Sequence, residues 1–250
     1  MKQIVLMYHD VYKVNPLESG FKRERDLPYK LEYGLFFNHV QAIADYCDAN
    51  SLSKESIVFT FDDGGSSFYS LIAPLLSQFG FCGHFYISTK HIGSDGFLNV
   101  DDIKGLERNG HIVGSHAHTH EHLYNLTEEQ VKKEWVDSVS ILSDILDHTI
   151  NEASIPNGDS SEIVLNAMNI AGLKEIYTSR PTTKKKIFND MTIHGRYVVL
   201  SNTSADEVLR IIQSPFSRFV LDSKWLVISV IKRLLGDNYV KLKNLIYRNR

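Results

Sequence analysis

Short apolar runs rich in β-branched and aromatic residues recur along the chain, with longer amphipathic stretches between them. This alternation is typical of parallel strands joined by crossover helices. Seven such runs are predicted to be strands, at residues 4–9, 57–62, 82–88, 111–116, 150–156, 174–180 and 196–201. Seven strands that alternate with helices predict an α/β fold that closes as a barrel.

Two segments between the predicted strands have opposite patterns. Residues 127–146 are predicted to be a helix, because Thr127 and Gln130 have the spacing of a capping box and an apolar stripe runs from Val131 to Leu146. We expect that stripe to be ordinary core. Residues 182–190 contain three consecutive lysines and no apolar periodicity, so they are predicted to be an exposed loop.

The composition permits one sizeable domain without a strong overall charge. The chain has 250 residues, of which 43% are hydrophobic, and a formal net charge of -3. That length and composition support a single core. The near-neutral balance offers no basic field to hold a polyanion, so nucleic acid is not expected as a partner.

Positive charge gathers towards the C-terminus. From residue 210 onward, nine Lys and Arg residues stand against two Asp residues, interspersed with apolar residues. We expect residues 1–203 to form the barrel and residues 204–250 to form a basic, amphipathic helical extension packed on it. The alternative is that this extension makes peripheral contact with an anionic membrane.

Cysteine usage and the N-terminal sequence both favour a cytoplasmic protein. Cys47 and Cys82 are too few for a disulfide framework, and both are expected to be reduced core residues. The apolar stretch at residues 4–8 is too short for the core of a signal peptide, and the run at residues 225–231 is too short to cross a bilayer.

Two adjacent carboxylates follow the apolar run at residues 57–61. Asp62 and Asp63 precede Gly64 and Gly65. In α/β barrels the carboxyl ends of the strands form the catalytic face, and adjacent carboxylates there repel each other unless a cation compensates or one is protonated. The alternative interpretation is ordinary turn chemistry, in which Asp caps the next helix.

Four histidines cluster at the end of the strand predicted at residues 111–116, namely His116, His118, His120 and His122. If the chain forms a helical turn there, His116 and His120 project from one face with their Cβ atoms about 5–6 Å apart. The Glu of the HExxH metalloprotease motif is missing. We expect His118 and His122 to point elsewhere.

Asp63, His116 and His120 make up a two-histidine, one-carboxylate set. Such a set binds a divalent ion and leaves positions open for water and substrate. A metal-bound water loses a proton near neutral pH, because the ion lowers its pKa to about 7. Asp62 would then be free to accept that proton, which implies hydrolysis of an amide or ester.

These two segments resemble motifs of the polysaccharide deacetylase family, also called the NodB-homology family or carbohydrate esterase family four. Its first two motifs, TFDDG and His-Ser/Thr-x-x-His, are matched by residues 60–64 and residues 116–120, with Ala117 in place of Ser or Thr. The resemblance covers about residues 4–200. It implies a distorted (β/α)7 barrel of the NodB-homology type, here with a C-terminal helical extension.

The resemblance also implies roles for individual residues. Asp62 would be the catalytic base, and Asp63, His116 and His120 would bind one divalent metal ion, with zinc preferred over cobalt, nickel or manganese. The opening MYHDV resembles the first strand of a large branch of the family, which places His9 near the same rim as a substrate-binding residue. The alternative for His9 is a structural hydrogen bond at a strand end.

The family's third and last motifs are altered in this sequence. Arg-Pro-Pro-Tyr-Gly aligns with residues 154–158, so Ser154 stands where the family has the Arg that orients the base. The retained turn would let the backbone N–H of Asn157 stabilise the oxyanion. His194 is the candidate general acid, with a plain loop residue as the alternative. Arg196 is expected to replace the lost Arg or to bind substrate, unless it is simply a surface residue at a strand start.

These features lead to one main functional hypothesis and two alternatives. The main hypothesis is a metal-dependent hydrolase that removes an N-acetyl or related acyl group from an amino sugar in an intracellular glycan precursor, as in O-antigen biosynthesis. The altered motifs leave open a catalytically impaired deacetylase-fold protein that binds sugar or acts as a scaffold. An amidohydrolase-type enzyme fits less well, because those barrels usually carry their His-x-His pair on the first strand.

Overall fold

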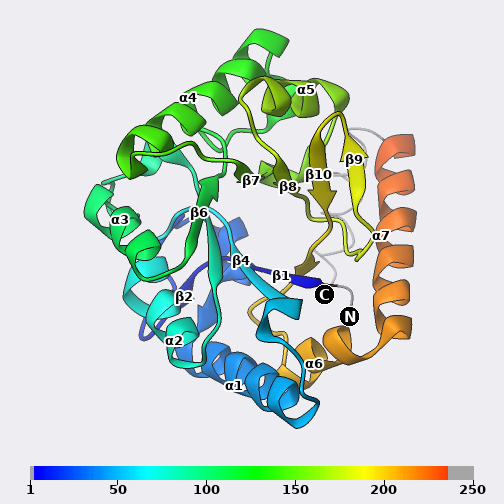
Figure 1. The fold of residues 1–250 in the computed structure, drawn as a ribbon. Coiled ribbons are helices and arrows are strands. Elements are labelled where there is room, and N and C mark those ends of the chain that lie inside the picture. Colours follow the sequence, from blue (N-terminus) through cyan, green and yellow to red (C-terminus); the bar gives the residue numbers. More distant parts are fainter. Residues whose placement is uncertain (1–2, 236–250) are drawn as a thin grey trace.

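All seven apolar runs form strands, and the structure adds four more. In the computed structural model, which describes residues 3–235, the nine strands of the main sheet surround a common centre (Figure 1). Their order is β11-β1-β4-β5-β6-β7-β8-β10-β9, and a separate pair is formed by β2 (Val11–Tyr12) and β3 (Leu31–Glu32). The strands of the main sheet are β1 (Ile4–Tyr8), β4 (Ile57–Phe61), β5 (Gly83–Ile87), β6 (Ile112–Ser115), β7 (Glu152–Ser154), β8 (Glu175–Tyr177), β9 (Lys186–Phe188), β10 (Met191–His194) and β11 (Tyr197–Val198).

One continuous segment, β10 to β11, pairs with the first and the last of the other parallel strands. β10 pairs in parallel with β8, and β11 pairs in parallel with β1. Only Gly195 and Arg196 lie between β10 and β11, so the same stretch of chain completes the sheet on both sides. This closure, with helices outside the strands, confirms the distorted (β/α)7 barrel predicted from the sequence (Figure 1).

The helices that surround the strands include the one predicted with most detail. They are α1 (Tyr33–Ala49), α2 (Ala73–Gln78), α3 (Val100–Arg108), α4 (Glu128–Leu146), α5 (Glu162–Ile170), α6 (Ala205–Gln213) and α7 (Pro215–Leu235), with short turns η1 (Glu24–Tyr29), η2 (Lys54–Ser56), η3 (Phe68–Ile72), η4 (Thr89–His91), η5 (Leu123–Asn125) and η6 (Pro156–Gly158). α4 begins with the predicted capping box between Thr127 and Gln130. Trp135 and Leu142 of its apolar stripe are fully buried in the core.

The loop predicted at residues 182–190 is partly wrong. β9 lies inside that range and pairs antiparallel with β10. β9 is an edge strand, and Ile187 at its centre is 72% exposed. β9 has only three residues, of which Phe188 alone packs against the core, so it is too short to show an apolar alternation in the sequence.

The C-terminal region continues the helical layer. Val208 and Ile212 of α6 belong to the same hydrophobic core as the barrel strands, and α7 follows α6 outside the strands (Figure 1). The predicted boundary at residue 203 stays a prediction, and residues 236–250 of the predicted extension lie outside the described residues. None of the helices within residues 3–235 is long and apolar enough to cross a membrane.

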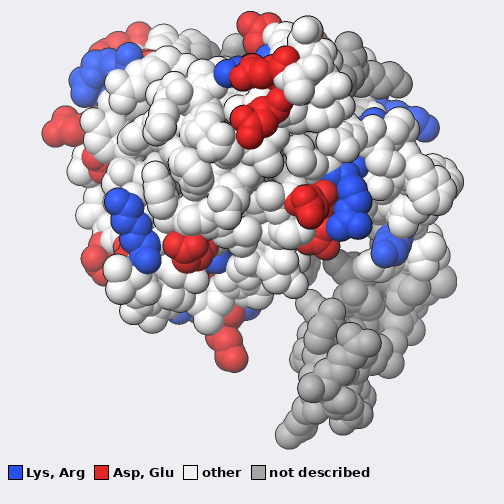
Figure 2. Space-filling view, turned by 90° about the horizontal axis from the view of Figure 1, so that it is seen from below, with Lys and Arg blue, Asp and Glu red and all other residues white. Residues whose placement is uncertain are grey.

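The surface carries charges of both signs. On the face shown in Figure 2, basic and acidic side chains are interspersed, with no continuous basic patch among the residues drawn in colour. The prediction that both cysteines are core residues holds for Cys47, which is buried, and is wrong for Cys82, which is exposed. Cys82 lies in the connection just before β5 rather than in the strand, so its side chain escapes the buried alternation.

The barrel closure generates a prediction about Gly195. A Cβ atom at this position would press against the backbone carbonyl oxygens of Arg180 and Thr182, well inside van der Waals contact. Because backbone atoms cannot move aside as a flexible side chain can, we expect Gly195→Ala to lower the free energy of unfolding by about 1–3 kcal/mol, measured by urea denaturation.

Gly34→Ala is the matched control. Gly34 lies in the first turn of α1, where the nearest atom to an added Cβ is Oε2 of the flexible Glu32 side chain, which accepts a capping hydrogen bond from Leu35 N–H. Its effect should stay within about 0.5 kcal/mol, since Ala is the better helix former. Equal stabilities of the two variants would contradict the tight closure at Gly195.

Candidate active site

The carboxyl ends of the parallel strands surround one pocket. Asp62 and Asp63 directly follow β4, His116 follows β6 and His9 follows β1. All four residues line a pocket of about 500 Å³, a volume that suits a small ligand. The strand-end positions that the sequence singled out are therefore brought together at the face where α/β barrels carry their active sites.

Arg196 holds Asp62 through two short hydrogen bonds. Its Nη1 donates to Oδ1 of Asp62 and its Nη2 donates to Oδ2, both at 2.7 Å. Nη2 also donates to Ser154 Oγ at 2.7 Å, and Ser154 Oγ donates to Asp62 Oδ2 at 3.1 Å. Arg196 thus contacts Asp62, as the sequence suggested for a substitute of the missing Arg at position 154.

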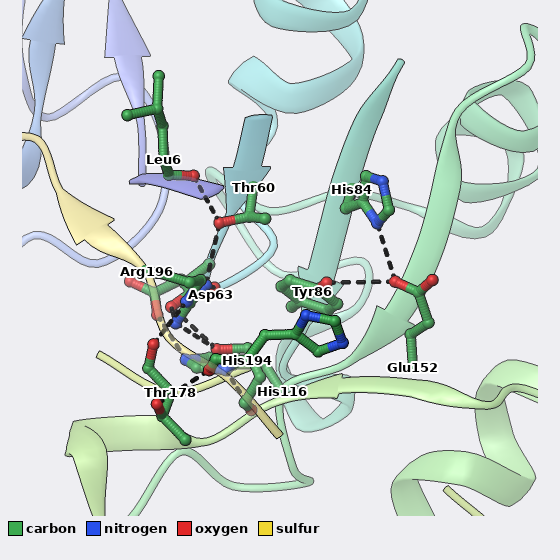
Figure 3. Close-up of polar contacts among 12 residues, drawn as sticks. Leu6, Thr60, Asp63, His84, Tyr86, His116, Glu152, Thr178, His194 and Arg196 are labelled. Carbon is green, nitrogen blue, oxygen red and sulfur yellow. Dashed lines mark hydrogen bonds and ion pairs between the residues drawn. The ribbon is translucent and has the colours of Figure 1, made fainter. Parts of the chain in front are cut away.

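The remaining donors of Arg196 are also satisfied. Nη1 reaches Thr60 Oγ1 at 3.1 Å, and Nε reaches the carbonyl oxygen of Thr178 at 3.2 Å. Figure 3 shows Arg196 between Thr60 and Thr178 with these contacts dashed. Arg196 is only 1% exposed, so this cation is fixed on several sides inside the barrel.

The charged neighbours of Asp62 keep it ionised. Burial opposes the charged form, but Arg196 and His116 together hold the pKa of Asp62 below its usual range. A buried carboxylate held in this state can accept a proton from a neighbouring water molecule. It is also oriented, because Arg196 fixes both of its oxygens.

The predicted metal ligands converge. Oδ1 of Asp63 lies 3.4 Å from Nε2 of His116 and 3.0 Å from Nε2 of His120. One ligand atom from each of the three residues lies within 4.8 Å of the others. Burial opposes ionisation of Asp63 too, but the two histidines hold its pKa well below the usual value, so the group offers a negative charge.

The hydrogen bonds around this triad fit a divalent cation. His116 Nδ1 lies 2.9 Å from the carbonyl oxygen of Ser154, which fixes Nδ1–H as the donor and leaves Nε2 as the ring atom that faces Asp63. Asp63 Oδ1 is buried and receives no hydrogen bond from any described residue. When both imidazoles are neutral, their Nε2 atoms and Asp63 Oδ1 offer three ligand atoms to a cation between them, and imidazole with carboxylate is a donor set that suits zinc.

The route by which the two histidines converge differs from the prediction. The chain from residue 116 to 120 is not a helical turn, because Ala117 and His120 have left-handed backbone conformations with φ of 59° and 61°. The ring centroids of His116 and His120 nevertheless lie 5.1 Å apart. The spacing identified the right pair, but an irregular loop brings the two rings together.

A buried acid from α4 stabilises that loop. Glu134 accepts hydrogen bonds from the backbone N–H groups of His118 and Thr119 and from the Thr119 hydroxyl, at 2.8–3.0 Å. His118 points away from the triad and its Nδ1 lies 2.9 Å from Thr89 Oγ1. Glu134 was not predicted as a functional residue, although an acid among the apolar positions of a helix is a signal that could have identified it.

Two further predicted residues lie in the pocket. His9 packs against Tyr29 with ring centroids 4.6 Å apart, and its Nδ1 is buried without a hydrogen-bond partner among residues 3–235. Asn157 lines the pocket in a left-handed conformation with φ of 56°, which Asn tolerates better than most residues. Asn157 therefore forms part of the pocket wall.

The structure does not bring His194 to this pocket. Its side chain lies deeper in the barrel, where Nε2 is 2.5 Å from Glu175 Oε2 and the ring stacks on Tyr177 at 4.6 Å. It is not among the residues that line the pocket. His194 is also not the loop residue of the alternative, because it ends β10.

Several residues of the pocket's outer wall were not predicted from the sequence. The segment between β2 and β3 contributes Phe21, Arg23, Arg25 and Tyr29, and α7 contributes Trp225. Phe21 packs against His120, with ring centroids 4.9 Å apart. These residues come from segments without a motif, so only the tertiary fold identifies them.

A buried polar network anchors that segment. Asp10 Oδ1 accepts hydrogen bonds from the hydroxyls of Ser19, at 2.5 Å, and Ser67, at 2.9 Å. The Lys30 ammonium donates to the carbonyl oxygen of Ser19 and lies 3.8 Å from Asp10 Oδ2. The pocket wall is therefore tied to the strand that carries His9.

Comparison with known proteins gives several matches. A sequence profile of the family described as polysaccharide deacetylase matches residues 49–176, just over half of the chain. YxkH of Bacillus subtilis is 25% identical over 180 residues, which cover 71% of this chain but only 64% of YxkH. The chain therefore spans less than two thirds of that relative's length.

Solved structures share the fold. The Streptococcus pyogenes deacetylase PplD in complex with acetate superposes with a TM-score of 0.71 at 21% identity, covering 85% of this chain and 99% of PplD. A polysaccharide deacetylase from Bacillus cereus superposes with a TM-score of 0.69 at 19% identity, covering 85% and 69%. The profile match includes Asp62, Asp63, His116 and His120, and the chain belongs to the polysaccharide deacetylase family.

Proposed function

We propose that this protein is a metal-dependent hydrolase that removes an N-acetyl or related acyl group from an amino sugar in a glycan precursor. The observation that carries this proposal is the Arg196-bound Asp62 beside the Asp63, His116 and His120 triad in one pocket. Family membership supports a deacetylase acting on a carbohydrate. The cytoplasmic location and a role in O-antigen biosynthesis stay predictions.

Asp63, His116 and His120 are the residues that would hold the metal. When bound there, a divalent ion supplies Lewis acidity, which lowers the pKa of water and polarises an acyl oxygen. Zinc is the preferred ion for this donor set, with cobalt, nickel and manganese as alternatives.

The remaining residues divide the proton transfers. Hydrolysis adds water across the amide C–N bond, so the water oxygen joins the acyl carbon and a proton must reach the departing amine. Asp62 accepts the proton of the attacking water, while the backbone N–H of Asn157, a residue that lines the pocket, would stabilise the oxyanion.

His9 is the residue best placed to give a proton to the amine. It lines the pocket, and burial lowers its pKa despite the nearby carboxylates of Asp63 and Asp62. Because this lowered pKa leaves the ring mainly neutral near pH 7, His9 would have to gain a proton in the catalytic cycle before it passes one to the amine. This assignment replaces the general-acid role predicted for His194.

The first prediction from the proposed function concerns metal binding. We expect EDTA to abolish acetate release from an N-acetylated sugar and zinc to restore it. His120→Gln should weaken metal affinity by at least about 100-fold, because it removes a ligand rather than a supporting contact. His118→Gln is the matched control, since His118 bonds to Thr89 and should leave metal content, measured by elemental analysis, unchanged. Equal metal retention in both variants would contradict the triad.

The second prediction concerns the base. Asp62→Asn keeps the shape of the side chain but cannot accept a proton, so kcat should fall by about 10²–10⁴-fold while metal content is preserved. Acetate release across a library of N-acetylated sugars measures the effect. If the metal-loaded wild-type protein releases no acetate from any of them, the alternative of a sugar-binding protein or scaffold is favoured.

The third prediction separates the two candidate acids. His9→Gln should lower kcat by about 10²-fold or more, whereas His194→Gln should leave the kinetics of the folded fraction within about twofold. The reason is position, because His9 lines the pocket and His194 bonds to Glu175 below it. A larger loss for His194→Gln than for His9→Gln would reverse the assignment.

A further inference from the structure

A second cavity lies between the barrel and the two C-terminal helices. This groove, of about 680 Å³, is lined by residues of α6 and α7 and by the chain around β11. Its α7 wall consists largely of apolar side chains, namely Phe216, Val220, Leu221, Trp225 and Ile228. Phe216 is 75% exposed and Ile228 is 45% exposed, so much of this apolar surface is left open to solvent.

The groove adjoins the active-site pocket. Ser179, Val198 and Trp225 line both cavities. A molecule whose reacting end occupies the pocket can therefore extend past Trp225 into the groove. In Figure 1, α7 stands outside the strands with no other labelled element beyond it.

Cations lie along the route. Arg210 and Lys224 line the groove, and within the described chain neither has a side-chain hydrogen bond or an ion pair. The acid that also lines the groove, Glu207, accepts hydrogen bonds from Ser204 at the start of α6. Arg25, on the pocket side, adds a further exposed cation. The combined cavity thus offers apolar contact together with positive charge.

We propose that the groove binds an aliphatic chain joined through a phosphate to the amino sugar, so that the substrate is a lipid-linked glycan precursor. The inference rests on the proposed function for the sugar end of the molecule. The apolar wall would bury the chain, and the unpaired cations would neutralise the phosphate. The position of the groove beside the pocket favours this occupant over an unrelated partner, because a lipid-linked sugar can fill the pocket with its sugar and the groove with its chain.

The test measures binding without turnover. The chain has two tryptophans, and Trp135 is fully buried in the core, so a ligand in the groove should change the fluorescence of Trp225. Butyl, octyl and decyl phosphate are titrated below their micelle concentrations, with inorganic phosphate as the blank. We expect saturable binding that tightens roughly tenfold for every two methylene groups buried.

Two neighbouring substitutions locate the ligand. Ile228→Glu places a charge in the groove and should weaken decyl phosphate binding at least tenfold. Val227→Glu is the matched control, because Val227 is 59% exposed on the same helix but does not line the groove, and it should leave binding unchanged. Circular dichroism serves to check that both variants keep the helix content of the wild-type protein.

Three results would overturn the proposal. Affinity that does not depend on chain length would remove the apolar contact. Equal weakening by both substitutions would show that the ligand binds the outer face of α7 and not the groove. That outcome would favour contact between α7 and a membrane surface. A dimer that dissociates in Ile228→Glu would assign the groove to a second copy of the chain. Failure of acetate release with intact binding would instead count against the proposed function alone.

Discussion

The buried ion pair between Asp62 and Arg196 is the interaction on which both the barrel and its site depend. Removing two charges from water is expensive, and only good geometry with further hydrogen bonds offsets that penalty. Here Arg196 donates to Asp62, Thr60, Ser154 and the Thr178 carbonyl oxygen, which lie on or just after strands β4, β7 and β8. Arg196 itself stands in the segment that closes the barrel, so correct closure and correct orientation of Asp62 require each other.

The small side chain at position 154 is part of the same constraint. Ser154 is fully buried, and its hydroxyl lies between Arg196 Nη2 and Asp62 Oδ2. A long side chain there would occupy the space that the guanidinium of Arg196 fills. Ser154 and Arg196 therefore form one unit, in which a cation from the link between β10 and β11 neutralises a carboxylate that follows β4. The Ser154 carbonyl oxygen also orients His116, which links this unit to the metal ligands.

Some strands and site residues could be predicted from the sequence, and others could not. Buried strands and α4 were predictable, because their apolar patterns reflect local burial. The hairpin of β9 and β10 and the exposed position of Cys82 were not, because an edge strand and a connection leave no such pattern. Likewise, Trp225 and the residues from Phe21 to Tyr29 reach the pocket only through tertiary packing, which no local motif encodes.

Strand register explains why His194 and Arg196 have different surroundings although they are two residues apart. Side chains two apart on a strand share a face but lie about 6–7 Å apart along it. His194 is paired in register with Tyr177, in the layer that contains Tyr86 and the His84–Glu152 pair (Figure 3). Arg196 lies one layer nearer the carboxyl ends, at the level of Asp62. Proximity in sequence therefore does not distinguish the surroundings of these two side chains, whereas the layer that each one occupies does.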